Sequence, residues 1–279
     1  MPQSKEIAEL PEQFSGFVNT ERGDFHYVRW GKGKRLVLAF HGYGESCTSF
    51  NLLHPYLADT CTFYSFDLPH HGLSKWNANQ LVQADDLKKL VNFVLDESAA
   101  QHCALIGYSM GGRVCLKIAE LFPDKIESMT LLASDGLAKD FYYALFTENT
   151  FGKLLFKSFF KNPSFFLALI KGLNKVKLID NSRYKFMMRY IGTHEGRELL
   201  KHCWPAMEPI QTDIAALAQQ LNGKAIPIYL FMGRYDRIIP LKNAVRFRKY
   251  MIGAHLQIIE KGHLILRPDT AAAIAKTLM

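Results

Sequence analysis

Short apolar segments alternate with amphipathic ones along most of this sequence. Arg35–Phe40 is continuously apolar after its first residue, a pattern typical of a strand buried on both faces of a parallel sheet. Residues 81–95 instead carry apolar side chains on one helical face, among them Leu87 and Leu90. The same patterns predict further strands at residues 17–20, 25–30, 61–66, 102–106, 128–133, 227–232 and 256–259, and further helices at residues 50–57, 110–122, 214–221, 242–251 and 270–278.

Strands that alternate with helices of this length predict right-handed βαβ units and a mostly parallel sheet, the α/β class. The alternation stops between residues 137 and 212, where no strand pattern appears. That stretch predicts several short helices, interrupted at residues 162–164, at Gly172 and at Gly192. We therefore expect a core formed by residues 1–136 and 213–279, with residues 137–212 inserted into it as a helical cap.

Composition limits the class of protein. The chain has 279 residues, 48% of them hydrophobic, which is enough for one large domain with an insertion. Its five cysteines are scattered, without a C-x-x-C pair, which indicates reduced thiols in the cytoplasm rather than disulfides or a zinc site. The sequence starts without a signal-peptide pattern, and no apolar run approaches the roughly 20 residues that cross a bilayer. We expect a cytoplasmic protein.

The positive charge is confined to one segment. Nine basic residues and a single acid, Asp180, lie between Phe151 and Tyr190, which accounts for the whole net charge of +8. Phenylalanines interleave with the lysines there, as they do in amphipathic helices that pack Phe on the core and leave Lys in water. A second interpretation is that the basic face contacts anionic lipid. No nucleic-acid motif accompanies the charge, so no nucleic-acid partner is expected.

Ser109 lies in the pentapeptide Gly107-Tyr108-Ser109-Met110-Gly111, a Gly-x-Ser-x-Gly motif. Alone the motif is weak, because chance produces one in roughly one chain in ten of this length. Here an apolar segment precedes it and a helical apolar face follows it, which is the strand, turn and helix that the motif requires. The serine hydroxyl would point out of such a turn at the positive end of the helix. Ser109 is the candidate nucleophile.

A serine hydroxyl needs a histidine base that is oriented by a carboxylate. In sheets of this kind, functional groups collect where strands end. His263 follows the last predicted strand whereas His255 precedes it, so His263 is the candidate base. Two aspartates, Asp236 and Asp135, follow strands after Ser109. Asp236 is preferred because it lies one strand from the histidine, and Asp135 remains the alternative acid.

An oxyanion formed at this serine needs backbone N–H donors. The N–H of Met110 is the first expected donor, because it directly follows the nucleophile at the start of a helix. The second is expected in His41-Gly42-Tyr43-Gly44, where two glycines allow close approach and Tyr43 supplies the N–H. His41 itself is expected to order this loop rather than to act chemically.

The segment Asp67-Leu68-Pro69-His70-His71-Gly72 contains two histidines and an aspartate. Their spacing is not that of a zinc site, and no second cluster completes one. We interpret the segment as a rigid turn packed beside the serine turn. No metal and no cofactor are expected.

Together these motifs resemble those of the α/β-hydrolase fold superfamily, in the same order along the chain. The resemblance covers residues 17–136 and 214–279, and it departs at His70, where the family often carries Gly. It implies an eight-stranded sheet with a helical cap inserted after the sixth strand. It also implies a Ser109–Asp236–His263 triad; families that use an aspartate nucleophile are disfavoured by Ser109.

The sequence therefore predicts a serine hydrolase that cleaves a carboxylic ester or thioester of small to medium acyl size through an acyl-enzyme. The partner is expected to be a small ester with an apolar acyl group. Two alternatives stay open: the same triad used for carbon–carbon bond hydrolysis or acyl transfer, and a binding protein that retains a small molecule with little turnover.

Overall fold

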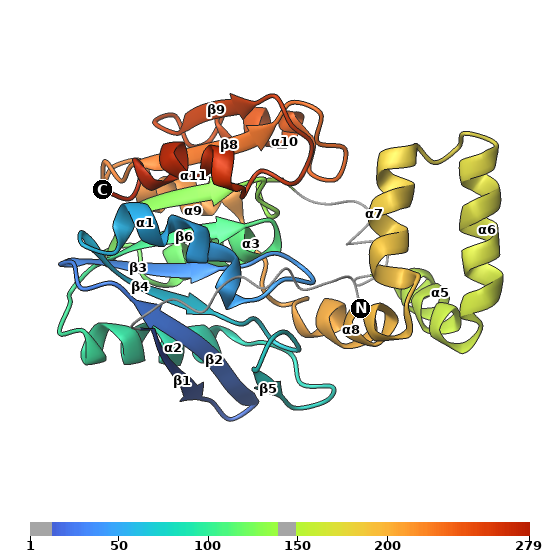
Figure 1. The fold of residues 1–279 in the computed structure, drawn as a ribbon, viewed down its shortest axis with the longest axis horizontal. Helices are drawn as coiled ribbons and strands as arrows, with labels where there is room; N and C mark the ends of the chain where they lie inside the picture. The colour runs from blue at the N-terminus through green and yellow to red at the C-terminus, as the bar shows by residue number, and fades with distance from the viewer. Residues whose placement is uncertain (1–12, 139–148) are drawn as a thin grey trace.

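One sheet organises the structure. The computed structural model describes residues 13–138 and 149–279; the amino-terminal residues 1–12 and residues 139–148 of the predicted cap lie outside the described residues. Eight strands follow one another across the sheet in the order β1-β2-β4-β3-β6-β7-β8-β9, and the short β5 pairs with β2 at its side (Figure 1). Their bounds are β1 Phe14–Asn19, β2 Gly23–Trp30, β3 Arg35–Phe40, β4 Cys61–Phe66, β5 Lys75–Trp76, β6 Cys103–Tyr108, β7 Ile126–Leu132, β8 Ile228–Gly233 and β9 His255–Ile259.

The six strands from β4 to β9 in this order run parallel, while β1, β2 and β5 pair antiparallel. The register places Phe40 of β3 opposite Gly107 of β6, so both strands end at one edge. This confirms the mostly parallel eight-stranded sheet, with the two-residue β5 as an addition. The parallel strands all direct their carboxyl ends to the same side of the molecule (Figure 1).

The core lies on both faces of the sheet because side chains alternate along each strand. In β3, Leu36, Leu38 and Phe40 join the hydrophobic cluster beneath α2 and α3. Val37 and Ala39 join the other cluster. The covering elements are η1 (Cys47–Leu53), α1 (His54–Leu57) and α11 (Pro268–Ala275) on this second face, and α2 (Ala84–Glu97), α3 (Met110–Leu121), α9 (Ile214–Leu221) and α10 (Leu241–Phe247) on the first.

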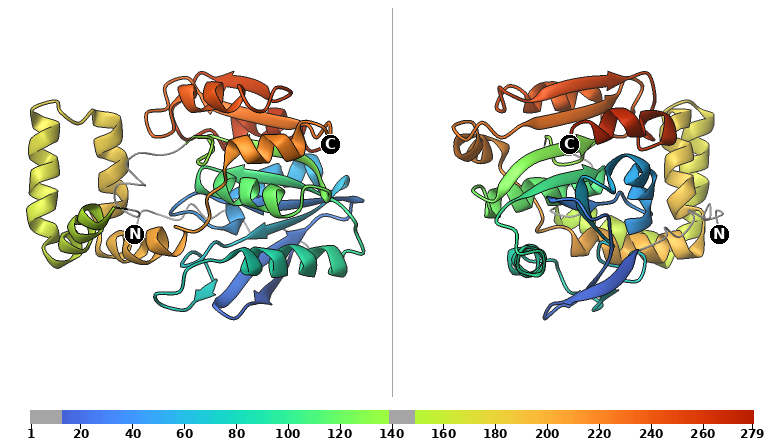
Figure 2. Two further views of the ribbon diagram at one scale, coloured as in Figure 1. Left: turned by 180° about the vertical axis from the view of Figure 1, so that it is seen from behind. Right: turned by 60° about the vertical axis from the view of Figure 1, so that its left-hand side comes forward.

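The helical insert follows β7, which is the sixth strand along the chain when β5 is left out, as predicted. Its described helices are α5 (Thr150–Lys161), α6 (Pro163–Lys175), α7 (Asn181–Ile191) and α8 (His194–Ala206). They stand beyond the carboxyl edge of the sheet, with α6 farthest from it (Figures 1 and 2). The predicted breaks near residue 163 and at Gly192 agree with the helix ends.

The predicted break at Gly172 is wrong. Gly172 lies inside α6, and a Cβ built there would meet nothing within 4 Å. A glycine costs a helix about 1 kcal/mol relative to alanine. The flanking leucines and lysines have high helix propensities, so the helix continues through this position.

All five cysteines are buried and free of disulfides. Among residues 13–138 and 149–279, no helix combines the length and apolarity that a bilayer span requires.

Candidate active site

Ser109 occupies a strained turn between β6 and α3. Its φ of 51° and ψ of −115° lie in a region that L-residues rarely adopt. The chain can turn there because two glycines let backbones touch: a Cβ at Gly111 would lie 1.8 Å from the Phe40 carbonyl oxygen, and one at Gly107 would lie 2.5 Å from the Gly111 carbonyl oxygen. The Ser109 N–H donates to the Leu132 carbonyl at 2.9 Å, which fixes the turn to β7.

His263 connects Ser109 to Asp236. Its Nε2 lies 3.0 Å from Ser109 Oγ, and its Nδ1 lies 2.7 Å from Asp236 Oδ2. An ionised carboxylate only accepts hydrogen bonds, so Nδ1 carries the proton and Nε2 is left to accept the serine hydroxyl. The other carboxylate oxygen of Asp236 accepts the backbone N–H groups of Ile238 and Ile239, at 2.8 and 2.9 Å. The Asp236 side chain is fully buried and immobilised by these bonds.

The alternative acid, Asp135, lies in a different arrangement. Its Oδ2 accepts a hydrogen bond from the buried Arg113, and its Oδ1 accepts the N–H of Gly136 at 2.7 Å. Its own N–H donates to the Ser109 carbonyl at 2.9 Å. The structure thus brings Asp236 to His263, and it uses Asp135 to hold Arg113 and the backbone of the serine turn.

The segments that carry the two predicted N–H donors lie beside Ser109: Met110 follows it directly, and a Cβ built at Gly42 would lie 3.3 Å from the Ser109 Cβ. Met110 is the first residue of α3, so its N–H is one of the four at that end without an acceptor inside the helix. The loop that contains Tyr43 is fixed on both sides. The Gly42 carbonyl accepts the Glu45 N–H at 3.2 Å, and the Gly44 N–H donates to His71 Nε2 at 2.9 Å.

Two buried histidines join this loop to the turn after β4. His41 Nε2 accepts the Leu68 N–H at 2.9 Å and its Nδ1 bonds the Gly42 carbonyl at 2.7 Å. His71 accepts the Gly44 N–H through Nε2 and donates through Nδ1 to the Pro69 carbonyl at 2.9 Å. In each ring, the nitrogen that accepts a backbone N–H must therefore be unprotonated. Burial lowers the pKa of His41, and burial together with His41 lowers the pKa of His71 to about 3, so both rings are neutral at pH 7.

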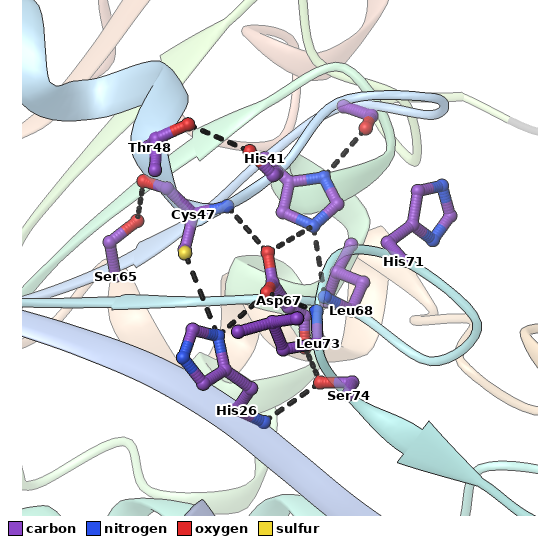
Figure 3. Close-up of polar contacts among 12 residues, drawn as sticks. His26, His41, Cys47, Thr48, Ser65, Asp67, Leu68, His71, Leu73 and Ser74 are labelled. Carbon is purple, nitrogen blue, oxygen red and sulfur yellow. Dashed lines mark hydrogen bonds and ion pairs between the residues drawn. The ribbon is translucent and has the colours of Figure 1, made fainter. Parts of the chain in front are cut away.

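The carboxylate of Asp67 holds the same turn in place through hydrogen bonds. Its carboxylate accepts hydrogen bonds from the N–H groups of Cys47 and Leu73, at 2.7 and 2.9 Å, and from His26 Nδ1 at 2.7 Å (Figure 3). Burial alone would raise the pKa of this carboxyl, but the hydrogen bonds from these donors hold it well below its usual range. The carboxylate is thus ionised and fully engaged.

A metal ion needs several ligand atoms close together. Within the described ranges, the group that meets this condition is His26, Cys47 and Asp67, whose ligand atoms lie within 4.8 Å of one another. Burial and the neighbouring Asp67 raise the pKa of the Cys47 thiol, which opposes the thiolate that a metal would bind. His26 Nδ1 and both oxygens of Asp67 are engaged in protein hydrogen bonds. The cluster is a hydrogen-bonded support of the loop after β3 (Figure 3).

His70, the departure from the expected glycine, has a φ of 65°. The turn therefore adopts a left-handed conformation at this position, which explains why glycine suits it and why histidine costs some strain there. His70 lies against His202 of α8, with ring centroids 5.5 Å apart.

Comparison with known proteins identifies the fold family. The family model described as alpha/beta hydrolase fold matches residues 35–267, which is most of the chain. The chain belongs to the alpha/beta hydrolase fold family.

Individual relatives of this hydrolase are distant. It is 25% identical over 249 residues to a protein of Bacillus subtilis described as uncharacterized hydrolase YugF, covering 84% of this chain and 85% of the relative. Among solved structures, a hydrolase from Pseudomonas aeruginosa matches with a TM-score of 0.66 at 18% identity, covering 95% and 97% of the two chains. A thermophilic esterase from Thermogutta terrifontis matches with a TM-score of 0.65 at 15% identity, covering 95% of each. These structures share the fold.

The hydrolase has an apolar pocket between the serine turn and the insert. We call it the insert pocket. Its volume is about 410 Å³, within the range of small-molecule sites. Ser109, Met110 and Tyr43 line it on the side of the sheet edge. Its walls are mostly aromatic and aliphatic, and they include Phe156, Phe159, Phe166, Ile170, Phe186 and Trp204.

The insert also touches the reactive groups directly. Phe186 of α7 packs edge-on against His263, with ring centroids 5.8 Å apart. Tyr190, one turn further along α7, packs against Tyr43 at 4.8 Å. The insert thus contacts both the histidine and the loop that contains Tyr43, and the His263 side chain is 9% exposed.

The sequence did not predict the part that three residues play in the site: His71, Arg113 and Tyr190. Arg113 lies four residues after Ser109, one helical turn along α3, and this spacing was the available signal. The contacts of His71 with Gly44 and of Tyr190 with Tyr43 join distant segments, so no local pattern marks them.

Proposed function

We propose that this hydrolase cleaves a carboxylic ester or thioester through an acyl-enzyme on Ser109. The observation that carries the proposal is the chain of two hydrogen bonds from Ser109 through His263 to Asp236, at 3.0 and 2.7 Å, with Ser109 lining an apolar pocket. A serine with a properly oriented base and N–H donors nearby is the equipment of acyl transfer.

In the first step, Ser109 Oγ attacks the carbonyl carbon while His263 Nε2 takes the hydroxyl proton. The N–H groups of Tyr43 and Met110 stabilise the negative charge on the carbonyl oxygen. The bond to the leaving oxygen or sulfur then breaks, and His263 gives its proton to that leaving group. The acyl group remains as an ester on Ser109.

In the second step, water attacks the acyl-enzyme while His263 takes a proton from it. The tetrahedral intermediate collapses, the bond to Ser109 Oγ breaks, and His263 returns the proton to the serine. Asp236 stays ionised throughout, and it stabilises the imidazolium that forms twice in each cycle.

The insert pocket is the proposed acyl site, and residues 137–212 are the proposed cap that contributes most of its wall. Its lining favours an apolar acyl group, because a polar chain there would lose its hydration without compensation. The esterase from Thermogutta terrifontis, which shares the fold, supports an ester as the substrate class. A cytoplasmic location stays a prediction.

The test is hydrolysis of p-nitrophenyl esters from acetyl to lauroyl, combined with labelling by a fluorophosphonate that reacts with activated serines. The native protein is expected to turn over at least one ester and to carry the label on Ser109. The Ser109→Ala variant is expected to lose both, with a loss of about 10⁴-fold or more in kcat. Ser164→Ala, an exposed serine of α6, is the matched control and is expected to keep both.

Three results would contradict the proposal in whole or in part. A folded native protein that neither hydrolyses any ester nor reacts with the fluorophosphonate would lack an activated serine. A small molecule that raises the melting temperature of that protein without being converted would identify a binding protein instead. Labelling without ester hydrolysis would contradict the ester substrate, and would favour another reaction of the same serine.

A further inference from the structure

Helix α6 lies at the far end of the insert (Figures 1 and 2). It exposes a stripe of apolar side chains to solvent. No residue of α6 is buried. Phe165, Leu169 and Val176 at its end follow a spacing of four and seven residues and so share one helical face. Their exposed fractions are 66%, 48% and 65%. An amphipathic helix normally packs its apolar face against another part of the protein. The stripe on α6 lacks such a partner in the described part of the chain.

The neighbouring segments also expose apolar side chains. Nineteen large apolar side chains are exposed in the described part of the chain, and seven of them lie between Phe151 and Leu178. Five of these seven are Leu or Val. About a tenth of the sequence therefore carries more than a third of the exposed large apolar side chains, which is a concentration rather than the scattered exposure of an ordinary surface.

The same segment is strongly basic. Six lysines and no acid lie between Phe151 and Leu178, and all six are exposed. Lys153 forms an ion pair with Glu208 at 3.3 Å. Within residues 13–138 and 149–279, the other five have no carboxylate within ion-pair distance; they are Lys157, Lys161, Lys171, Lys175 and Lys177.

We propose that the exposed face of α5, α6 and the turn after α6 docks on the surface of an anionic phospholipid bilayer. The apolar stripe would enter the boundary between headgroups and acyl chains, and the lysines would lie at the phosphates. A second copy of this chain is a poor occupant, because it would oppose one lysine-rich face to another. Nucleic acid would satisfy the lysines but would give Leu169 and Val176 nothing apolar to contact.

The docking face and the insert pocket belong to the same helices. Phe166 and Ile170 of α6 line the pocket, next in sequence to Phe165 and Leu169 of the stripe. Leu155 of α5 lines the pocket and is itself 37% exposed. Docking would thus bring one wall of the pocket to the bilayer, from which an ester with an apolar acyl chain could enter. This consequence rests on the proposed function, whereas docking itself does not.

The test is flotation of the full chain with phosphatidylcholine vesicles that contain or lack phosphatidylglycerol, at low salt and at about 0.15 M salt. All proteins carry Ser109→Ala, so that binding is measured without turnover and independently of the proposed function. The parent protein is expected to float with the anionic vesicles at low salt and to bind more weakly as salt rises.

Two pairs of variants locate the contact. K171E/K175E is expected to weaken binding roughly 30-fold, and L169S/V176S roughly 10-fold. Their controls are K242E/K249E and V245S/I252S, which change equally exposed side chains of α10 and the turn after it. These controls are expected to bind like the parent, and unchanged melting temperatures would show that all four proteins are folded.

The proposal is overturned if the parent fails to float with anionic vesicles at low salt, or if the controls weaken binding as much as the α6 variants. A dimer in sedimentation that the α6 variants abolish, without any vesicle binding, would identify a second copy as the partner. A shift of duplex DNA without vesicle binding would identify nucleic acid.

Discussion

The carboxyl edge of the sheet and the helices α5 to α7 differ in how far their side chains are buried and hydrogen-bonded. At the edge, polar side chains are buried and engaged: His41, Asp67 and His71 are at most 4% exposed, and each makes at least two hydrogen bonds. In α6 no side chain is buried. The groups proposed to break and form bonds are therefore held by hydrogen bonds at this edge, and Phe186 of the insert packs against His263. The groups proposed to contact the acyl chain belong to a part that is free to vary without unfolding the sheet.

The two aspartates near Ser109 offer the sharpest test of this contrast. Asp236→Asn is expected to lower kcat by about 10⁴-fold, because the amide no longer holds His263 in the required tautomer or stabilises its charge. Asp135→Asn is expected to change kcat little. Instead it lowers the free energy of unfolding by about 3 kcal/mol, because the buried Arg113 loses its carboxylate partner.

Ester hydrolysis and urea unfolding of both variants check this pair. An equal loss of kcat in a folded Asp135→Asn protein would assign the acid role to Asp135.

The next effect concerns the loop after β3. His71→Ala removes the acceptor that fixes the Gly44 N–H, so the Tyr43 N–H next to it loses its orientation. We expect a fall of about 10²-fold in kcat with a small change in KM, because the lost interaction acts on the transition state. Steady-state kinetics measures this split. The control is His102→Ala, an exposed histidine before β6, which is expected to behave like the native protein. A change in KM alone would contradict a role of His71 in positioning the loop.

The same two regions differ in how far sequence patterns predict them. The bounds of β3, β4 and α9 agree with the prediction to the residue, because polar residues flank each of these mostly apolar segments. Ser109, His263 and Asp236 could be proposed because each follows a strand, and parallel strands end at one edge.

Errors arise where a contact from elsewhere decides the local structure. The helix predicted to start at residue 81 starts at Ala84, because the Val82 N–H bonds the Ala206 carbonyl of α8. Gln83 then caps the helix together with Asp86. In the insert, the pattern of Phe and Lys predicted helices but not which Phe would line a pocket. Which Phe lines the pocket depends on how α5, α6 and α7 pack together, and the sequence of one helix does not determine this packing.

Two buried groups at the edge, His71 and Asp67, contribute to the pH dependence of stability. Burial lowers the pKa of His71 to about 3, whereas an unfolded histidine titrates near 6.5. Below about pH 6.5 the unfolded chain thus binds a proton that the folded protein does not. This lowers the free energy of unfolding by about 1.4 kcal/mol per pH unit down to about pH 3. Asp67 has the depressed pKa of an engaged carboxylate, so its contribution is present above about pH 4 and is lost only below that.

Urea unfolding across this range separates the two groups. Between about pH 6.5 and pH 4 the slope of the unfolding free energy against pH is expected to be smaller in His71→Ala than in the native protein, by about one proton. Equal slopes would mean that His71 is protonated in the folded state.

The smallest effect is expected in the insert, where a single change should alter selectivity without touching the chemistry. Phe166→Ala enlarges the insert pocket, so the ratio of kcat/KM for long over short p-nitrophenyl esters is expected to rise by about 10-fold. Labelling of Ser109 by the fluorophosphonate should stay at the native rate, because the edge of the sheet is unchanged. The matched control is Phe165→Ala, the adjacent residue, which points to solvent and is 66% exposed. In the absence of vesicles it should leave the ratio unchanged. An equal shift in both variants would mean that α6 influences selectivity through its stability rather than through the shape of the pocket.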